Sequence, residues 1–293
     1  MEILSTIYSN DELNNLIDYA DGFILMLKPF SVCYKEDINL DLALDLIKKN
    51  NKKAILGINK IYHPSDILEI KEFLKKYNSN DLYYYVSDLG VCNILMDMGL
   101  SNNIIYNPET MITNYLDLGL LNDNHFNAYQ MSSEITLEDI KYAYEKTNAP
   151  LIYYGFGHKI MFYSKRKLLS LYENKTGIKM PKEGYLREVT REDYMPVCEN
   201  TNGTYILRSY VISLLDELDN IDFLKYLLLD SNFVESDKYM KVLNLFNKLN
   251  KKEINKEDAL LKLNELKLNI QDGFKNNDTV YLKEELKKWN MNY

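Results

Sequence analysis

The 293-residue sequence is poor in the residue types that build metal centres and covalent cross-links. Its three cysteines, Cys33, Cys92 and Cys198, lie 59 and 106 residues apart and form no CxxC pair. This spacing argues against a structural zinc site or a self-contained iron–sulfur site. The odd, sparse count also argues against a secreted disulfide framework. Three histidines on separate segments, without an HExxH motif, predict no metal site, and we expect no cofactor.

Long apolar runs and an excess of positive charge are also absent. No stretch approaches the roughly 18 apolar residues that a membrane span needs. The start, "MEILSTIYSNDELNNL", has no basic segment followed by an apolar one, so we expect a cytoplasmic protein without membrane contact. The net charge of −8 means that any contact with RNA requires a local basic patch.

Common catalytic signatures are missing as well. The sequence has no GxSxG motif, so a hydrolase nucleophile elbow is unsupported. The segment "GFGHK" (155–159) lacks the GxxxxGK[ST] spacing of a phosphate-binding loop. No glycine-rich turn follows the first apolar segment, which weighs against a dinucleotide-binding fold.

What the sequence does contain is a regular alternation of strand-like and helix-like segments. The helix-like segments include 39–50, 64–78, 136–148, 211–218 and 236–250. The strand-like segments are 3–7, 22–27, 53–59, 82–86, 103–107, 127–131, 150–155 and 223–230. Such β-then-α units indicate parallel strands joined by helices, in an open doubly wound sheet or a closed barrel. Their number favours an α/β fold of the TIM-like (β/α)8 barrel type.

The alternation breaks in a turn-rich segment at about 173–209, which we expect to be a β-rich insertion. We therefore predict a barrel domain over residues 1–250 that includes this insertion. A helical C-terminal extension, residues 251–293, is expected to pack on the barrel.

Three segments together resemble a known family: "GFGHKIMFYSKRKLLSLY" (155–172), "ENTNGTYILRS" (199–209) and the ending "DGF…DTVYLKE". Their order is similar to the collagenase-like peptidase family U32, in the short form of Gram-positive bacteria and their wall-less (mollicute) relatives. The resemblance implies a TIM-barrel-like domain with its site at the C-terminal ends of the strands. It also implies a link of the short form to tRNA wobble-uridine hydroxylation, for which prephenate is implicated as a donor. The family's historical activity is that of a peptidase or hydrolase.

The sequence departs from the family pattern where reactive groups are expected. The family histidine corresponds to Phe156 and the cysteine after it to Ile160, and no cluster cysteines remain. We therefore expect a degenerate or accessory subunit in tRNA wobble-uridine 5-hydroxylation that binds RNA or a small anionic molecule. Its expected partners are tRNA and a longer, cysteine-bearing homologue. The alternative is a collagenase-like peptidase, and whether the chain is an enzyme stays open.

The candidate site residues come from strand ends and from positions that match the family. Glu109 and Glu134, after the fifth and sixth strands, are candidates for an acid/base pair, and His63 follows the third strand. Substrate or anion contacts are expected from Asn59, Thr113, Asn114, Gly157, His158, Ser164, Lys165 and Arg166. Lys159, Lys165, Arg166 and Lys167 form the main basic cluster, and Ser164 is expected to cap a helix that starts at Lys165. The simpler interpretation is a solvated helix start, a loop histidine and water-exposed carboxylates.

Overall fold

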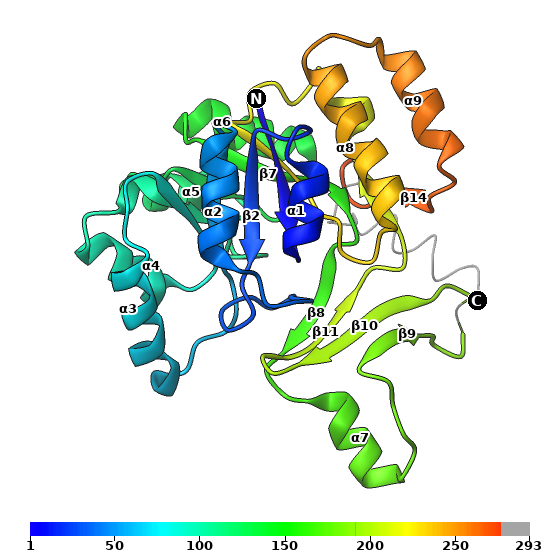
Figure 1. Ribbon diagram of the computed structural model, residues 1–293. Coiled ribbons are helices and arrows are strands. Elements are labelled where there is room, and N and C mark those ends of the chain that lie inside the picture. Colours follow the sequence, from blue (N-terminus) through cyan, green and yellow to red (C-terminus); the bar gives the residue numbers. More distant parts are fainter. Residues whose placement is uncertain (191, 277–293) are drawn as a thin grey trace, which may run out of the picture.

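The structure is a computed structural model that describes residues 1–190 and 192–276. Eight parallel strands close into a barrel (Figure 1). These strands are β1 Glu2–Ile7, β2 Gly22–Met26, β3 Lys53–Ile58, β4 Leu82–Val86, β5 Ile104–Tyr106, β6 Ala128–Gln130, β7 Leu151–Gly157 and β13 Tyr226–Leu229. Strand β13 closes the ring because Tyr226 is in register with both Glu2 of β1 and Ile152 of β7. The predicted TIM-like (β/α)8 barrel is confirmed.

Helices connect the strands and lie around the barrel. They are α1 Asn10–Leu16, α2 Leu40–Lys49, α3 Ile67–Lys76, α4 Leu89–Asp97, α5 Tyr115–Asn122, α6 Leu137–Thr147 and α8 Ser236–Asn250. Helix α2 shows why these segments are helical: Leu40, Ala43 and Ile47 recur at helical spacing and are buried together. The Asn39 side chain caps its first turn by accepting a hydrogen bond from the Leu42 amide.

The barrel strands are apolar on both faces, because one face meets the helices and the other fills the barrel. In β1, Ile3 and Ile7 belong to the cluster shared with the helices, whereas Leu4 belongs to the cluster inside the barrel. Ile24, Ile55 and other large side chains complete the inner cluster. Since the interior is packed, a ligand site has to lie at an end of the barrel.

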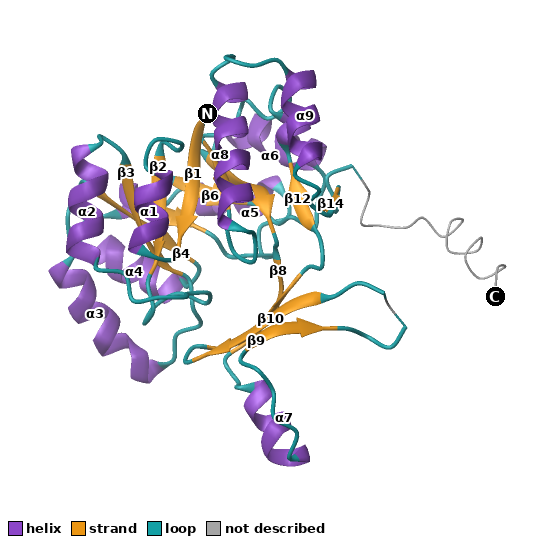
Figure 2. Ribbon diagram, turned by 45° about the vertical axis from the view of Figure 1, so that its right-hand side comes forward, coloured by secondary structure: helices purple, strands orange, loops and turns teal. Residues whose placement is uncertain are grey.

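A second, antiparallel sheet lies at the C-terminal ends of the barrel strands (Figure 2). Its strands are β8 Ile160–Ser164, β9 Glu183–Leu186, β10 Met195–Asn200 and β11 Gly203–Leu207, in the order β8-β11-β10-β9. Helix α7, Leu168–Thr176, projects from it. We call residues 160–207 the small lobe. It starts before the insertion expected at about 173, because β8 pairs with β11, and its Cys198, Tyr205 and Leu207 pack against the barrel interior.

Two local predictions are wrong. Residues 211–218 are not a helix but strand β12, Val211–Ser213, followed by a short 3-10 turn, η3, Leu215–Glu217. Strand β12 pairs with β7 and with β14, Ile270–Gln271, so sheet partners outweigh the helix preference of a short apolar segment. The helix predicted to start at Lys165 begins at Leu168, because β8 continues through Ser164.

Towards the C-terminus, helix α9, Lys256–Glu265, contacts α8 and η3. Residues 277–293 of the predicted C-terminal extension, including all of "DTVYLKE", lie outside the described residues. The domain boundary at residue 250 stays a prediction. Across the described part of the chain, no helix combines the length and the apolar character that a membrane crossing requires.

Candidate functional site

Two adjoining cavities lie at the C-terminal ends of the barrel strands, which we call the barrel mouth. The inner cavity, about 40 Å³, is lined by strand-end side chains that include Thr6, Tyr8, Asn107, Tyr154 and Asp230. The outer cavity, about 380 Å³, lies between the barrel and β8 and is lined in part by Lys60, Glu134, Phe162 and Arg208. Asn59, Glu109, Lys159 and Ile160 line both cavities, so the inner one lies directly behind the outer one.

Lys159 is a buried cation at the junction of the two cavities. Its residue is 6% exposed, and its ammonium donates a hydrogen bond to Ser133 Oγ. Burial lowers the pKa of Lys159, although the charges of Glu109 and Glu134 act in the opposite direction. No ion pair within 4.0 Å joins Lys159 to a carboxylate of the described residues, in contrast to the other cations of the cavity.

Arg208 lies on the wall of the same cavity and is held in place from several sides. Its Nη2 donates to Glu134 Oε1 at 3.0 Å, and its Nη1 donates to Tyr210 Oη at 2.5 Å. The guanidinium also lies 5.1 Å from the centre of the Phe274 ring. His158 Nδ1 is 2.9 Å from the Arg208 carbonyl oxygen, and because a carbonyl only accepts, Nδ1 donates. Burial lowers the pKa of His158, which favours the neutral ring.

Glu109 is fixed at the boundary of the cavities by Asn107. The Asn107 Nδ2 donates to Glu109 Oε1 at 2.9 Å, and the Glu109 amide donates to Asn107 Oδ1 at 3.0 Å. These bonds hold Glu109 at a φ of 60°, a left-handed conformation that is uncommon for this residue type. Asn107 also donates to Tyr85 Oη at 2.6 Å, and Tyr85 donates to Gln130 Oε1 at 3.0 Å.

Asp230, at the end of β13, accepts hydrogen bonds from three hydroxyl groups of the inner cavity. Thr6 Oγ1 and Tyr8 Oη donate to its Oδ1 at 2.8 Å each, and Tyr154 Oη donates to its Oδ2 at 3.3 Å. Burial raises the pKa of both tyrosines well above the ordinary value, and the Asp230 charge adds to this shift. The phenols therefore stay protonated donors, and the carboxylate anchors the floor of the site.

Several of the predicted residues come together at the barrel mouth. Asn59, Glu109 and Glu134 line the outer cavity, and the Asn59 Oδ1 accepts a hydrogen bond from the Val32 amide at 3.1 Å. Gly157 contributes through its backbone, with a φ of 128°. A Cβ there would lie 2.6 Å from the Asp230 carbonyl oxygen and 2.6 Å from Tyr154 Oη, so glycine allows β7 to approach β13.

The other predicted residues lie outside the two cavities. His63 is exposed and begins the 3-10 turn η1, Pro64–Asp66, where its amide donates to Asp66 at 2.8 Å. Asn114 is exposed and caps α5, and the exposed Thr113 precedes it. Lys165 forms an ion pair with Asp66 at 2.5 Å. The remaining three are Ser164, whose hydroxyl accepts from the Arg166 amide, Arg166, whose side chain is exposed, and His158, which lines neither cavity.

The motifs that resemble the family most closely hold the small lobe together. Glu199 accepts hydrogen bonds from the Leu169 and Ser170 amides of α7 at 2.7 and 3.1 Å. Asn202 Nδ2 donates to the carbonyl oxygens of Lys28 and Ser31 at 3.0 and 2.8 Å, which attaches the β10–β11 turn to the barrel. Gly203, with a φ of 133°, lies so close to Ser164 that a side chain does not fit.

The cysteines do not form the Cys–His pair that a cysteine peptidase needs. All three are buried, and burial raises the pKa of Cys33, which lines the inner cavity, well above its ordinary value. Cys92 lies in the core within α4 and Cys198 lies in β10. Among the described residues, no group of three or more His, Cys, Asp or Glu side chains is placed to hold a metal ion.

Sequence reasoning missed Arg208, Asp230 and Asn107 as site residues. Asn107 and Asp230 each end an apolar strand segment, a position that faces the site in this fold. Their strand-end positions could therefore have identified both residues from the sequence. No such sequence signal marks Arg208, because it reaches the cavity only through the pairing of β11 with β8.

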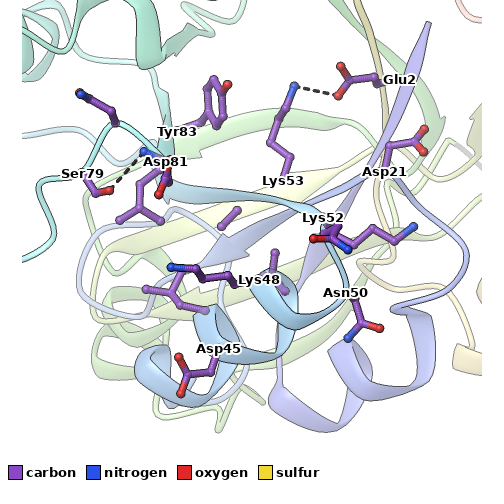
Figure 3. A pocket seen from close by; sticks show the side chains of 16 residues that line it. Glu2, Asp21, Asp45, Lys48, Asn50, Lys52, Lys53, Ser79, Asp81 and Tyr83 are labelled. Atoms are coloured by element: carbon purple, nitrogen blue, oxygen red, sulfur yellow. Dashed lines mark hydrogen bonds and ion pairs between the residues drawn. The ribbon is translucent and has the colours of Figure 1, made fainter.

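A larger groove, about 920 Å³, lies at the opposite end of the barrel, where β1, β3 and β4 begin (Figure 3). There the Lys53 side chain points to Glu2 and forms an ion pair at 2.7 Å. Lys53 Nζ also donates to Tyr226 Oη at 2.7 Å and lies 4.9 Å from the centre of the Tyr83 ring. The charge of Lys53 is thus paired within the protein. In barrel enzymes the active site lies at the opposite end, at the C-terminal ends of the strands.

Comparison with known proteins gives one family match and several distant likenesses. The model of peptidase family U32 matches residues 27–291. The "tRNA hydroxylation protein P2" of Bacillus subtilis (strain 168) is 23% identical over 195 residues, which are 64% of this chain and 62% of that protein. The match thus spans less than two thirds of that relative.

Solved structures resemble the chain only in fold. A chitinase from Chromobacterium violaceum ATCC 12472 has a TM-score of 0.39 at 10% identity, over 78% of this chain and 93% of that one. A chitinase-type C-terminal domain from Desulfitobacterium hafniense DCB-2 has a TM-score of 0.40 at 11% identity, over 85% and 99% of the two chains. At these values neither likeness carries a functional argument.

Proposed function

Since the family match covers most of its length, the chain belongs to peptidase family U32, and we propose that it is a subunit in tRNA hydroxylation whose barrel mouth binds a small anionic molecule. The tRNA part of the proposal is supported by the similarity to tRNA hydroxylation protein P2. Hydroxylation at the wobble uridine follows from the family resemblance of the sequence motifs.

The buried ammonium of Lys159 is the observation that carries the anion-binding part. An ammonium has three donors, and within the described residues only Ser133 Oγ accepts one of them. A desolvated cation without a paired carboxylate is costly unless an anion completes its surroundings. A carboxylate of the ligand would supply that partner, with Arg208 on the wall of the same cavity.

The rest of the outer cavity suits a small carboxylate that carries a ring. Ile160, Met161, Phe162 and Tyr163 provide an apolar wall next to the cations. The Asn59 amide and the Glu109 carboxylate provide polar contacts at the inner end. Prephenate, which the family resemblance implicates as a donor, has this chemistry and is the first ligand to test.

We assign this chain the role of an accessory subunit rather than that of the catalyst. Its cysteines are buried on separate elements, and no thiol–imidazole pair lines the cavities in the described part of the chain. The proposed partner that supplies the reactive centre is a longer, cysteine-bearing homologue. A pull-down with the tagged chain from its native host tests for that partner.

The function is tested by deleting the gene in a host that makes 5-hydroxyuridine derivatives and analysing its tRNA by mass spectrometry. We expect the modification to fall, to return with the wild-type gene, and not to return with Lys159→Met. Lys251→Met, an exposed lysine in the α8–α9 connection, is the matched control and should restore it. Unchanged modification in the deletion strain would remove the tRNA part of the proposal.

Binding is tested separately by titrating prephenate into the purified chain in a calorimeter. Wild type and Lys251→Met should bind, whereas Lys159→Met should not. The thermal unfolding midpoint of Lys159→Met should match or exceed that of wild type, because the substitution removes a desolvated charge. If Lys159→Met binds prephenate as wild type does, the ammonium is not the anion contact.

A further inference from the structure

Positive charge is concentrated on one segment of the small lobe. Residues 165–182 contain six Lys and Arg against one Glu, a net charge of +5 in a chain whose net charge is −8. The segment runs from the end of β8 through α7 towards β9. In both ribbon views it lies at the end of the lobe that is remote from the α8–α9 connection (Figures 1 and 2).

Four of these cations are exposed and have no ion-pair partner in the described part of the chain. They are Arg166, Lys167, Lys175 and Lys179. The other two have structural partners: Lys165 pairs with Asp66 at 2.5 Å, and Lys182 pairs with Glu199 at 3.0 Å. The lobe therefore separates cations that hold its structure from cations that face solvent.

Exposed aromatic and apolar side chains accompany these cations. Tyr172 of α7 is 49% exposed. Phe162 of β8 is 41% exposed, lines the outer cavity and lies four residues before Arg166. An exposed ring beside a cationic surface is the arrangement on which single-stranded nucleic acids bind, with phosphates on the cations and bases on the rings.

From this arrangement we infer that the segment 165–182 binds the backbone of a single-stranded RNA segment, with a base stacked on Phe162 at the entrance of the outer cavity. This inference extends the proposed function by naming RNA as the ligand of the lobe. An unpaired loop suits the surface because its bases are free to stack and its phosphates follow a narrow path.

A flat anionic surface fits the lobe less well. The turn between β9 and β10 carries Glu188, Glu192 and Asp193 beside Arg187 and Arg191, so it adds no net positive charge for a membrane surface that covers the whole lobe. Helix α7 has nine residues, so it offers a small apolar face for insertion into lipid. A single RNA strand can contact α7 without passing over that turn.

The test measures fluorescence anisotropy of a labelled, unmodified anticodon stem-loop RNA whose wobble base is uridine. Two charge variants, Arg166→Gln/Lys167→Gln and Lys175→Gln/Lys179→Gln, are compared with the control Lys251→Gln/Lys256→Gln, which changes the net charge equally. If both replaced cations contact phosphates, affinity at ~0.1 M salt should fall about 25-fold and the salt slope should decrease by about 1.4. Phe162→Ala should weaken binding about tenfold and leave the salt slope unchanged.

The inference is overturned if the wild-type chain does not bind the RNA at low salt, or if the control pair loses as much affinity as the lobe variants. Binding to phosphatidylserine vesicles without binding to RNA would also overturn it. Prephenate titrations of the same variants separate the two proposals. The two charge variants should lose RNA but keep prephenate, which would support the inference, and a wild-type chain that binds RNA but not prephenate refutes only the proposed cavity ligand.

Discussion

Glu199 is expected to stabilise the small lobe through its charge, and Glu199→Gln tests this directly. The side chain is 2% exposed. It accepts from the Leu169 and Ser170 amides, from the Ser170 and Thr204 hydroxyls and from Lys182 Nζ at 3.0 Å. Burial alone would raise its pKa, but these hydrogen bonds outweigh burial and lower the pKa from 4.5 to about 2.

The magnitude follows from the shift in pKa. Each pKa unit corresponds to ~1.36 kcal/mol, so the ionised carboxylate contributes about 3 kcal/mol to folding. This contribution is fully present above the unfolded pKa, near 4.5, and is lost as the pH falls towards about 2. Glutamine keeps one acceptor oxygen but no charge, so Glu199→Gln should lower the free energy of unfolding by about 2 kcal/mol near neutral pH.

Urea unfolding of wild type and Glu199→Gln between neutral and acid pH is the assay. The difference between the two proteins should be largest near neutral pH and should shrink as the pH falls below 4.5. Hydrogen exchange adds a local measurement, because the Leu169 and Ser170 amides should exchange faster in the variant. A difference that stays constant across this pH range would show that Glu199 does not act as a charged cap.

Three further predictions concern the barrel mouth and its contact with the lobe. Because burial lowers the pKa of Lys159 below the ordinary lysine value of 10.5, prephenate affinity should fall with rising pH before exposed lysines titrate. Calorimetry at increasing pH checks this, and an affinity that stays constant up to that value would contradict it. Gly157→Ala should lower the free energy of unfolding by about 2–3 kcal/mol, because its Cβ would meet the Asp230 carbonyl oxygen at 2.6 Å and its φ is 128°. An unchanged urea midpoint would contradict that. Asn202→Ala leaves the Ser31 carbonyl without its side-chain partner and should cost about 1–3 kcal/mol, with faster proteolysis of the small lobe; equal cleavage rates would show that the contact is dispensable.

The sequence predicted the barrel well because its determinants are local. Apolar segments of strand length recur between amphipathic segments, and each such unit commits the chain to parallel strands. Residues that end these strands, such as Asn59 and Glu109, then reach one face by geometry alone, and both line the cavities. The same rule could have identified Asn107 and Asp230, which end strands in the same way.

Prediction failed where pairing between distant segments decides the structure. Residues 211–218 have the composition of a short helix, yet β12 forms because β7 and β14 offer backbone partners. Pairing between distant segments also places Lys165, whose expected anion contact stays a prediction: folding brings its ammonium to Asp66, 99 positions away in the chain. Lys165 therefore has a structural partner.

The sequence by itself determined the ring of alternating strands and helices and the end of that ring at which polar side chains gather, because both follow from periodicity along the chain. Only the tertiary structure decided which cation is buried without an ion-pair partner among the described residues, and which cations are paired or exposed. Burial and ion pairing depend on residues far apart in sequence, so Lys159, Lys165 and Arg166 look equivalent in the sequence and differ in the folded protein.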